Sequence, residues 1–465
     1  MTIRTGEFFS SLRKCHPRRV RFRRTPLTAT WGELDTLGRA VFPLPQAGQP
    51  YGMTPRPVID STLSLLINGF AWLPSAWRRR SGNVVRTRLT GRHAVALRGP
   101  EAVEFVYDDK HLRREGTIPE PIKSTLFGHG GVQDLDGERH RVRRVLFLRL
   151  LTDPGNIAEL VAHTTAAWDD ASRTWSTVPQ VTVFDEASRV LLRGVSEWAG
   201  IRLDGTQVEP LAHDLVSTVD GFATLGPRHW RARRARTRLE EWATNTVLEA
   251  RARLSTTRPS SPLDDVARHR EMEGALLEPR IAGVELLNVI RPTVAVAWYV
   301  TFAAHALQLW PENRDRLREG DQVFSRAFAN EVRRFYPFAP FIGGRAVSDL
   351  TWLDEPIPSG SLVLLDLYGQ NHDAALWDEP YRFRPERFLS RPAGHNELVP
   401  QGGGDPRASH RCPGEDLTVS LLTELSTRLA RLDYAVPEQD LTIPFDRIPT
   451  RPRSGIIVAN VRPPG

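Results

Sequence analysis

The chain has few cysteines and no cysteine pairs. Only two of its 465 residues are cysteine, Cys15 and Cys412, and they lie far apart in the sequence. Two distant cysteines exclude a disulfide framework, and the lack of a Cys-X-X-Cys pair argues against a zinc site. Because such cysteine usage is typical of a reducing compartment, we expect a cytoplasmic protein.

Long hydrophobic runs are also missing. No run of roughly 18 apolar residues is present, and the nearest candidate, residues 61–77, is interrupted by Asn68 and Pro74. We therefore predict no membrane span. No apolar segment follows the basic residues at the N-terminus, so no signal peptide is predicted. With 40% hydrophobic and 25% charged residues, the chain has the composition of a soluble globular protein.

The excess of positive charge lies at one end. Residues 1–25 contain eight basic residues and one acidic residue, which accounts for the whole net charge of +7. The rest of the chain is balanced, so no nucleic-acid partner is predicted. We interpret residues 1–52 as a basic, disordered extension, with polyanion binding as a second interpretation. Residues 53–465 are expected to form a single domain, and Met53 is an alternative start.

The patterned part of the sequence is mostly helical. Residues 84–97 alternate and turn at Gly91, which predicts a hairpin. Short strands are expected within 340–370, and proline-rich irregular sequence follows from 376 to 411. Helical periodicity predicts helices at about 101–110, 138–151, 157–171, 229–254, 278–309 and 321–336, and a last helix that starts at Pro413. Segment 229–254 is rich in Arg and Glu and predicts a solvated helix face.

Cys412 lies in the segment PQGGGDPRASHRCPGEDL, residues 400–417, directly before Pro413. Proline favours the first turn of a helix, whose free N–H groups would face the sulfur, lower the pKa of the thiol and favour thiolate. The preceding glycines would let the backbone approach something flat and bulky. A buried structural cysteine is the first alternative, and a nucleophile with His410 as its base is the second.

A carboxylate is expected on the apolar face of the helix at 321–336. Apolar residues flank Glu331 on that face, and Arg334 lies one turn further along. A buried carboxylate needs a partner, which Arg334 provides at this spacing. An ordinary surface pair is the alternative, since the ExxR motif is common. The segment FRPERF, residues 383–388, follows about fifty residues later and contains Arg387.

The order of ExxR, PERF and a glycine-rich loop with HxCxG resembles the cytochrome P-450 superfamily. The resemblance implies heme b as the cofactor, bound in the loop of His410 and Cys412, with Cys412 as the axial thiolate ligand of the iron. It also implies that Glu331, Arg334 and Arg387 brace the core beside the heme. The expected fold is mainly α with a minor β-rich region, and the heme lies between the long central helix and the cysteine-loop helix.

The long apolar helix carries one charge near its centre. From Leu286 to Pro311, Arg291 is the only permanently charged side chain, and the nearby acid Glu285 lies about 120° away around the helix. An unpaired buried guanidinium costs on the order of several kcal/mol, so we expect an anion to reach it from outside the helix. A carboxylate can accept two parallel hydrogen bonds from the guanidinium group of Arg291. Pro292 is expected to kink the helix. The alternative is that Arg291 reaches an edge or pairs with a distant acid.

The Arg291–Pro292 pair, together with RRFYPFAPFIG and LLDLYGQNHD, is similar to the hydrogen-peroxide-dependent fatty-acid hydroxylases, the peroxygenase branch of that superfamily. Oxygen-activating members typically carry an acid–threonine pair in this helix, whereas here Thr293 follows Arg–Pro without an acid. The resemblance implies that Arg291 holds the fatty-acid carboxylate, which serves as the acid–base group for cleaving H2O2. It implies hydroxylation at the α or β carbon and no need for a redox partner protein.

His140 and Arg144 are four residues apart on the helix predicted at 138–151 and share one face. The resemblance implies that they bind a heme propionate, and a solvated basic face is the alternative. Gln133 occupies a position where decarboxylating members often have histidine and hydroxylating members more often have glutamine. Because glutamine has no titratable proton to donate, hydroxylation is favoured over the formation of terminal alkenes.

Phe127 and Ala339 complete the predicted substrate pocket. Ala339 stands where relatives commonly have glycine, and its methyl group would narrow the pocket or shift the attack between the two carbons. The alternatives to a fatty-acid peroxygenase are a decarboxylase, an enzyme for another carboxylic acid, and a heme-binding protein without turnover. Arg291 argues against the last of these, since a protein that merely holds heme has no need of it.

Overall fold

The computed structural model describes residues 59–78, 84–253, 261–407 and 409–462. The predicted extension at 1–52 and Cys15 lie outside these residues, so the division into an extension and a single domain stays a prediction. The first described elements are two short helices with a 3-10 turn between them, α2 (Thr62–Asn68) and α3 (Trp72–Arg78). Residues 61–77 are therefore not one continuous helix, because the chain turns directly after Asn68, whereas Pro74 lies within α3.

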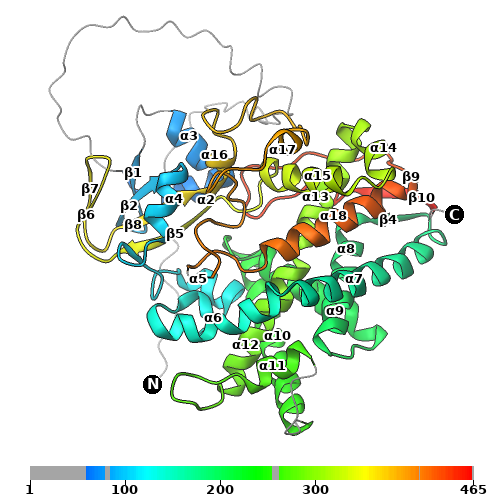
Figure 1. Cartoon of the computed structure of the whole chain (residues 1–465), viewed down its shortest axis with the longest axis horizontal. Helices are drawn as coiled ribbons and strands as arrows, with labels where there is room; N and C mark the ends of the chain where they lie inside the picture. The colour runs from blue at the N-terminus through cyan, green and yellow to red at the C-terminus, as the bar shows by residue number, and fades with distance from the viewer. Residues whose placement is uncertain (1–58, 79–83, 254–260, 408, 463–465) are drawn as a thin grey trace, which may run out of the picture. The chain divides into compact units, whose positions relative to one another are not determined.

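A five-stranded sheet packs against α3 (Figure 1). Its first two strands, β1 (Val85–Leu89) and β2 (Arg92–Leu97), pair antiparallel across Gly91, where φ is +78°. This confirms the predicted hairpin. The sheet is completed by β3 (Leu112–Arg113), β5 (Phe341–Ala346) and β8 (Leu362–Asp366), in the order β1–β2–β8–β5–β3. Only the β2–β8 pair is parallel among these strands.

The first half of the chain is otherwise helical, as predicted. Its helices are α4 (Pro100–Tyr107), α5 (Glu120–Ile122), α6 (Gly137–Leu151), α7 (Pro154–Trp175), α8 (Val183–Ala199), α9 (Gly205–Asp220), α10 (Pro227–Arg253) and α11 (Pro262–Arg268). A π-helical turn at Lys123–Phe127 and a 3-10 turn at Val132–Asp134 connect α5 to α6. The sequence predictions located α4, α6, α7 and α10 and missed α5, α8, α9 and α11.

Two helices replace the single long helix expected at 278–309. They are α12 (Pro279–Val294) and α13 (Val296–Leu309), and the break lies at Ala295. Pro292 lies within α12, three residues before the break, and has no N–H to donate to the carbonyl of Asn288. In the described part of the chain, residues 279–309 alone are long and apolar enough to cross a membrane, but 94% of their most apolar window is buried. They form a core helix pair that contacts α8, α10 and α18.

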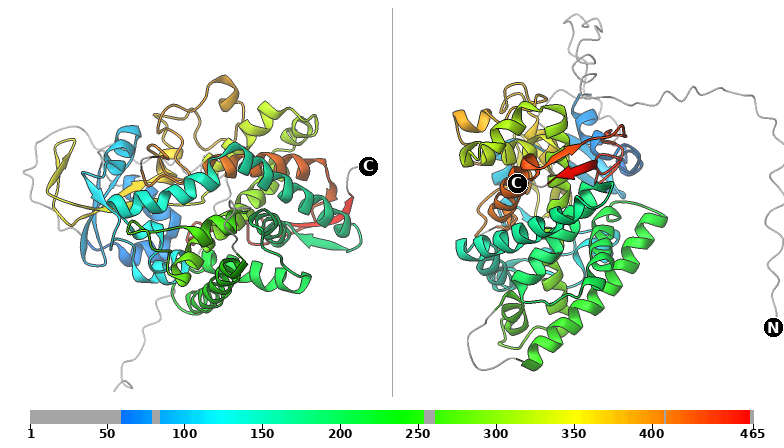
Figure 2. Two further views of the ribbon diagram at one scale, coloured as in Figure 1. Left: turned by 60° about the horizontal axis from the view of Figure 1, so that its bottom comes forward. Right: turned by 90° about the vertical axis from the view of Figure 1, so that its right-hand side faces the viewer.

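The second half supplies the remaining elements. The helices are α14 (Glu312–Arg318), α15 (Gln322–Phe335), α16 (Leu367–Asn371), α17 (Arg387–Ser390) and α18 (Glu415–Arg431). Two small sheets contain β4 (Gln180–Thr182), β10 (Ile457–Arg462) and β9 (Asp433–Ala435), and β6 (Leu350–Trp352) with β7 (Glu355–Ile357). Helix α18 contacts α7, α13 and α15 and lies at the centre of the helical layers (Figures 1 and 2).

Candidate active site

Arg291 is buried in the last turn of α12, immediately before the break, and only 7% of it is exposed. Its Nη2 donates to Asn288 Oδ1 over 3.4 Å, which is a long hydrogen bond, and its Nε has no hydrogen-bond partner. The guanidinium carbon lies 5.6 Å from the centre of the Phe127 ring. No carboxylate among the described residues forms an ion pair with Arg291. Within that part of the chain, the alternative of a distant acidic partner does not hold.

The surroundings of Arg291 disfavour its charge. Burial lowers the pKa of Arg291 to about 9, and the positive charge of Arg236 acts in the same direction. Arg236 belongs to α10, is 3% exposed and donates to the carbonyls of Leu126 and Phe127. The solvated face predicted for 229–254 is present, since Arg231, Arg234, Arg238 and Glu241 are exposed, but Arg236 lies on the buried face of α10. Arg236 has its own partner, since its Nε lies 2.6 Å from Glu240 Oε1, whereas Arg291 has no ion pair among the described residues.

A buried polar chain reaches Arg291 through Asn288. The Nδ2 atom of Asn288 donates to Glu285 Oε2 at 2.9 Å and to Gln133 Oε1 at 3.2 Å. The other oxygen of Glu285 accepts a hydrogen bond from Arg143 Nη1 at 2.6 Å. Burial raises the pKa of Glu285, while Arg143 and Asn288 oppose that effect. The structure thus brings the predicted Gln133 to Asn288, the neighbour of Arg291.

The glycine-rich loop before Cys412 packs against α4. A Cβ atom on Gly402 would lie 2.2 Å from the Tyr107 hydroxyl oxygen, and one on Gly403 would lie 2.2 Å from Val103 Cγ1. Gly402 also has a φ of +94°, which side chains rarely adopt. These glycines are required by the approach to α4, so the contacts in the described structure account for them without the flat group that the sequence suggested.

The environment of the Cys412 sulfur differs from the prediction. Burial raises the pKa of the thiol, whereas the backbone N–H of Gly414 and the positive charges of Arg144 and Arg333 act against that rise. The predicted net lowering was wrong, because burial outweighs the helix terminus and α18 starts two residues later than expected. A bound metal cation would reverse this balance, since it deprotonates a coordinating thiol outright.

The residues present fit an iron that arrives within a cofactor. Across the described residues, no group of three or more His, Cys, Asp or Glu side chains is arranged to hold a metal ion. An iron bound by Cys412 would therefore take its other ligands from a macrocycle, as in heme. Gln401 Nε2 lies 3.7 Å from the sulfur, and the Oε1 of this buried amide has no hydrogen-bond partner. A single sulfur with donors around it suits a thiolate ligand.

His140 and His410 stack on each other between α6 and the cysteine loop. Their ring centroids are 3.9 Å apart, and His410 Nε2 lies 3.3 Å from Asp136 Oδ1. Burial lowers the pKa of His140 to about 3, so this imidazole is neutral at physiological pH. Before an anion binds, His140 therefore offers a hydrogen bond but no charge.

Arg144 supplies the charge on the same face of α6. Its guanidinium donates to two backbone carbonyls of the cysteine loop, those of Pro406 at 3.0 Å and Arg411 at 2.6 Å. The predicted heme-binding side chains His140, Arg144 and His410 thus all meet the loop that carries Cys412. Their contact with a propionate stays a prediction.

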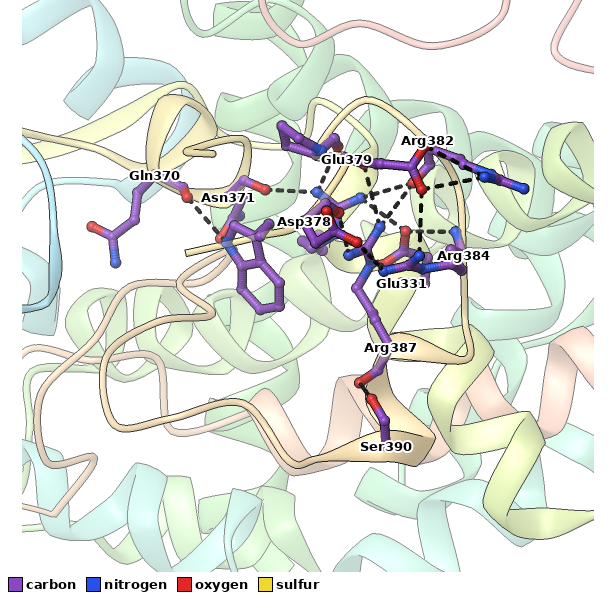
Figure 3. Close-up of polar contacts among 12 residues, drawn as sticks. Glu331, Gln370, Asn371, Asp378, Glu379, Arg382, Arg384, Arg387 and Ser390 are labelled. Carbon is purple, nitrogen blue, oxygen red and sulfur yellow. Dashed lines mark hydrogen bonds and ion pairs between the residues drawn. The ribbon is translucent and has the colours of Figure 1, made fainter. Parts of the chain in front are cut away.

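Glu331 and Arg334 form a fully buried ion pair within α15. Nε and Nη2 of Arg334 each lie 2.8 Å from one oxygen of Glu331, and both side chains are 0% exposed. Arg387 Nε lies 3.1 Å from Glu331 Oε2, and the backbone N–H of Arg384 donates to Glu331 Oε1. Figure 3 shows Arg384 and Arg387 beside Glu331. The alternative of an ordinary surface pair does not hold.

The two residues predicted for the substrate pocket, Phe127 and Ala339, lie in different surroundings. Phe127 ends the π-helical turn and faces Arg291, as described above. Ala339 is half-buried and packs against the apolar cluster of α4 and the five-stranded sheet. Its place in the substrate pocket stays a prediction.

Sequence reasoning missed Asn288 and Arg143. Asn288 lies three residues after Glu285 and three before Arg291, a spacing that puts all three within reach along one side of a helix, so this signal was available. Arg143 lies on α6, 142 residues from Glu285, and no local pattern links the two. The same holds for Arg236, whose burial depends on tertiary packing.

Comparison with known proteins identifies the class to which this fold and site belong. A family model described as Cytochrome P450 matches residues 323–452. Cytochrome P450SP alpha (CYP152B1), solved with (R)-ibuprophen, is 38% identical with a TM-score of 0.84, covering 87% of this chain and 100% of that one. The chain belongs to the cytochrome P450 family, and its cofactor is heme.

Two further solved structures are similar to this chain. Cytochrome P450EX alpha (CYP152N1) with myristic acid is 34% identical, with a TM-score of 0.82. A variant of cytochrome P450 OleT in complex with arachidonic acid is 32% identical, with a TM-score of 0.83. Both matches cover 87% of this chain and 97% of the other. These similarities confirm the predicted fold and the predicted resemblance to the peroxygenase branch.

Proposed function

We propose that the protein is a heme-thiolate peroxygenase that hydroxylates fatty acids at the α or β carbon with H2O2. The observation that carries this proposal is Arg291, a buried guanidinium without an ion-pair partner among the described residues. A fatty acid offers one carboxylate for this charge and an apolar chain for the surrounding helices. The myristic-acid and arachidonic-acid complexes of similar proteins support this substrate class.

The heme, when bound, would supply the oxidising chemistry, and a thiolate ligand favours cleavage of the O–O bond. Cys412 would be that ligand. Arg144 would offer its guanidinium to an acidic group of the cofactor, with His140 and His410 beside it. Glu331, Arg334 and Arg387 would hold α15 against the segment before α17 and keep the core rigid near the cofactor.

Arg291 would bind the substrate carboxylate through two parallel hydrogen bonds. Pro292, by breaking the helix, would open the space that the carboxylate occupies. With the carboxylate held, the α and β carbons are the C–H positions nearest to the clamp, so position follows from geometry.

In the described part of the chain, the two side chains near this clamp that could handle a proton are both engaged. The hydroxyl of Thr293 donates to the Val289 carbonyl at 2.9 Å within its helix, and Glu285 is paired with Arg143. The bound carboxylate would therefore serve as the acid–base group for H2O2, which explains why an external redox partner would not be required. A cytoplasmic location goes with this proposal.

Formation of terminal alkenes by decarboxylation is the second candidate function. Gln133 favours hydroxylation, because its Oε1 accepts from Asn288 and its amide has no titratable proton to give. Action on another carboxylic acid would use the same clamp.

Product analysis tests the proposal. Heme-loaded protein is incubated with H2O2 and saturated fatty acids of graded length, and products are identified by mass spectrometry. Hydroxy acids with the hydroxyl on the α or β carbon are expected, and only traces without peroxide. Terminal alkenes as the main product would favour the decarboxylase, and an unaltered acid would overturn both.

The ligand assignment has its own test. The carbon-monoxide difference spectrum of the reduced protein is expected to show the band of a thiolate-ligated heme. A band typical of an imidazole-ligated heme would reject Cys412 as the ligand.

A further inference from the structure

The hydrogen-bond partners around Asn288 fix the orientation of its side-chain amide. The oxygen and nitrogen of an asparagine amide have nearly the same shape, so the neighbours decide which atom faces which way. On one side of Asn288 lies the carboxylate of Glu285, and on another lies the amide oxygen of Gln133. On the third side lies the guanidinium of Arg291, which has donors only.

Glu285 and Arg291 set this direction from two sides. An ionised carboxylate only accepts hydrogen bonds, so it must face the Nδ2 atom, which it does at 2.9 Å. Oδ1 of Asn288 is then turned toward Arg291. Gln133 alone does not fix the arrangement, because its own amide can present either atom.

Glu285 has an ion-pair partner other than Arg291. Arg143 is 2% exposed and lies 2.6 Å from Glu285, and it also pairs with Glu271. Arg291 therefore meets a neutral carbonyl oxygen and not an anion. The neutral contact holds the guanidinium in place and leaves its positive charge available.

We propose that Glu285 is a positioning residue for the substrate carboxylate, acting through Asn288. With Arg143 as its anchor on α6, it turns the Asn288 oxygen toward Arg291 and so aims the guanidinium without neutralising it. This inference rests on the proposed function of Arg291 as the carboxylate clamp.

Glu285→Gln tests the inference with almost no change of volume. The new amide carries both a donor and an acceptor, so it no longer dictates the direction of Asn288. The measurement is calorimetric titration of the heme-loaded protein with myristic acid and with the fourteen-carbon alcohol. The ratio of the two affinities, acid over alcohol, is expected to fall about tenfold, the size of one lost charge-assisted contact.

Binding of the fourteen-carbon alcohol distinguishes a loss of Arg291 orientation from general damage to the cavity. A distorted pocket weakens acid and alcohol alike, so an unchanged ratio would overturn the inference even if both affinities fell. Glu285→Asp gives a second test, because it keeps a charge for Arg143 but withdraws the oxygens by one methylene. A smaller fall of the ratio in the same direction is expected, and an unchanged ratio would count against the role of Glu285.

A double-mutant cycle tests the route through Asn288. Asn288→Leu removes the amide and is expected to lower the ratio at least as much as Glu285→Gln. Adding Glu285→Gln to Asn288→Leu is expected to produce no further fall. Two effects that multiply independently would overturn the proposed route.

Asp214→Asn is the matched control. It also changes a buried carboxyl group to an amide in an ion pair, since Asp214 is 6% exposed and accepts hydrogen bonds of 2.6 and 2.8 Å from Arg238, whose side chain is 56% exposed. Its acid-to-alcohol ratio is expected to stay at the wild-type value.

Arg291→Ala separates a failure of the positioning role from a failure of the proposed carboxylate clamp. A ratio unaffected by Arg291→Ala would reject the clamp itself, whereas a ratio lowered there but not by Glu285→Gln would reject only the positioning role.

Discussion

Two buried arginines of this protein differ in whether the folded chain compensates their charge. Arg334 has both oxygens of Glu331 within 2.8 Å and also donates to the carbonyls of Asn371 and Pro380. Arg291 has one long hydrogen bond to a neutral amide and an Nε atom without a partner. Both side chains lie inside the helical core, so burial alone does not separate them.

The difference lies in what each arginine still requires. Every buried donor must be satisfied, and an unpaired buried ion is costly unless something compensates for it. Arg334 is compensated by the chain itself, so its role is complete in the folded protein. Arg291 lacks such compensation among the described residues, which marks it as a binding group. The presence or absence of an ion-pair partner therefore distinguishes Arg334, a structural arginine, from Arg291, a functional one.

The largest effect is expected from breaking the compensated site. Glu331→Ala leaves Arg334 and Arg387 without their shared carboxylate and should destabilise the fold by about 3–5 kcal/mol. Thermal unfolding followed by circular dichroism measures this loss. The control is Glu138→Ala, which breaks an exposed pair with Arg141 and should cost at most about 1 kcal/mol. Equal losses in both variants would contradict the contrast.

Removing Arg291 should have the opposite effect: a large loss of activity and no loss of stability. Arg291→Ala is expected to lower peroxide-driven turnover of fatty acids by at least about a hundredfold, because binding and the acid–base group are lost together. The melting temperature of the substrate-free protein should stay equal or rise, since a costly buried charge disappears. Heme content is measured alongside. Retained activity would refute the clamp.

The pH dependence of binding sharpens the same comparison. The pKa of Arg291 lies at about 9, so the guanidinium is charged below that pH and neutral above it. Fatty-acid affinity should be level between roughly pH 7 and 8 and fall about tenfold per unit above pH 9. Calorimetric titration measures it, with the matching alcohol as a ligand whose affinity should not follow this curve. An acid affinity that is flat to pH 10.5 would contradict the assignment.

The smallest effect is expected from a substitute for the missing acid. Acetate at millimolar concentration should allow slow oxidation of short substrates without a carboxyl group, because it occupies the clamp and replaces the acid–base group. Product formation with and without acetate is compared by mass spectrometry. Arg291→Ala should abolish the gain. No gain in the unmodified protein would argue against a substrate-assisted reaction.

The sequence predicted features that depend on local pattern. The hairpin at Gly91, the apolar face around Glu331 and the isolated charge at Arg291 are all visible in short windows, and each is found in the structure. Helix α9 was missed although Asp204 and Gln207 form a capping box, a signal that a stricter search for helix starts would have used.

Features that depend on distant packing were not predictable in this way. The partner of Glu285 lies on α6, and the burial of Arg236 arises from the contact of α10 with the Phe127 segment. The pKa direction of Cys412 was predicted wrongly for the same reason, since local helix geometry was known but the burial of the sulfur was not.

The engagement of Thr293 and Glu285 elsewhere has a consequence for the resistance of the protein to inactivation by peroxide. Thr293 and Glu285 are both engaged elsewhere, so the vacant clamp gives peroxide no proton donor from these two side chains. Under the proposed function, oxidant would be consumed mainly when a fatty acid is in place. An enzyme built in this way would tolerate peroxide during starvation for its substrate, and its inactivation rate would report on how often the clamp stands empty.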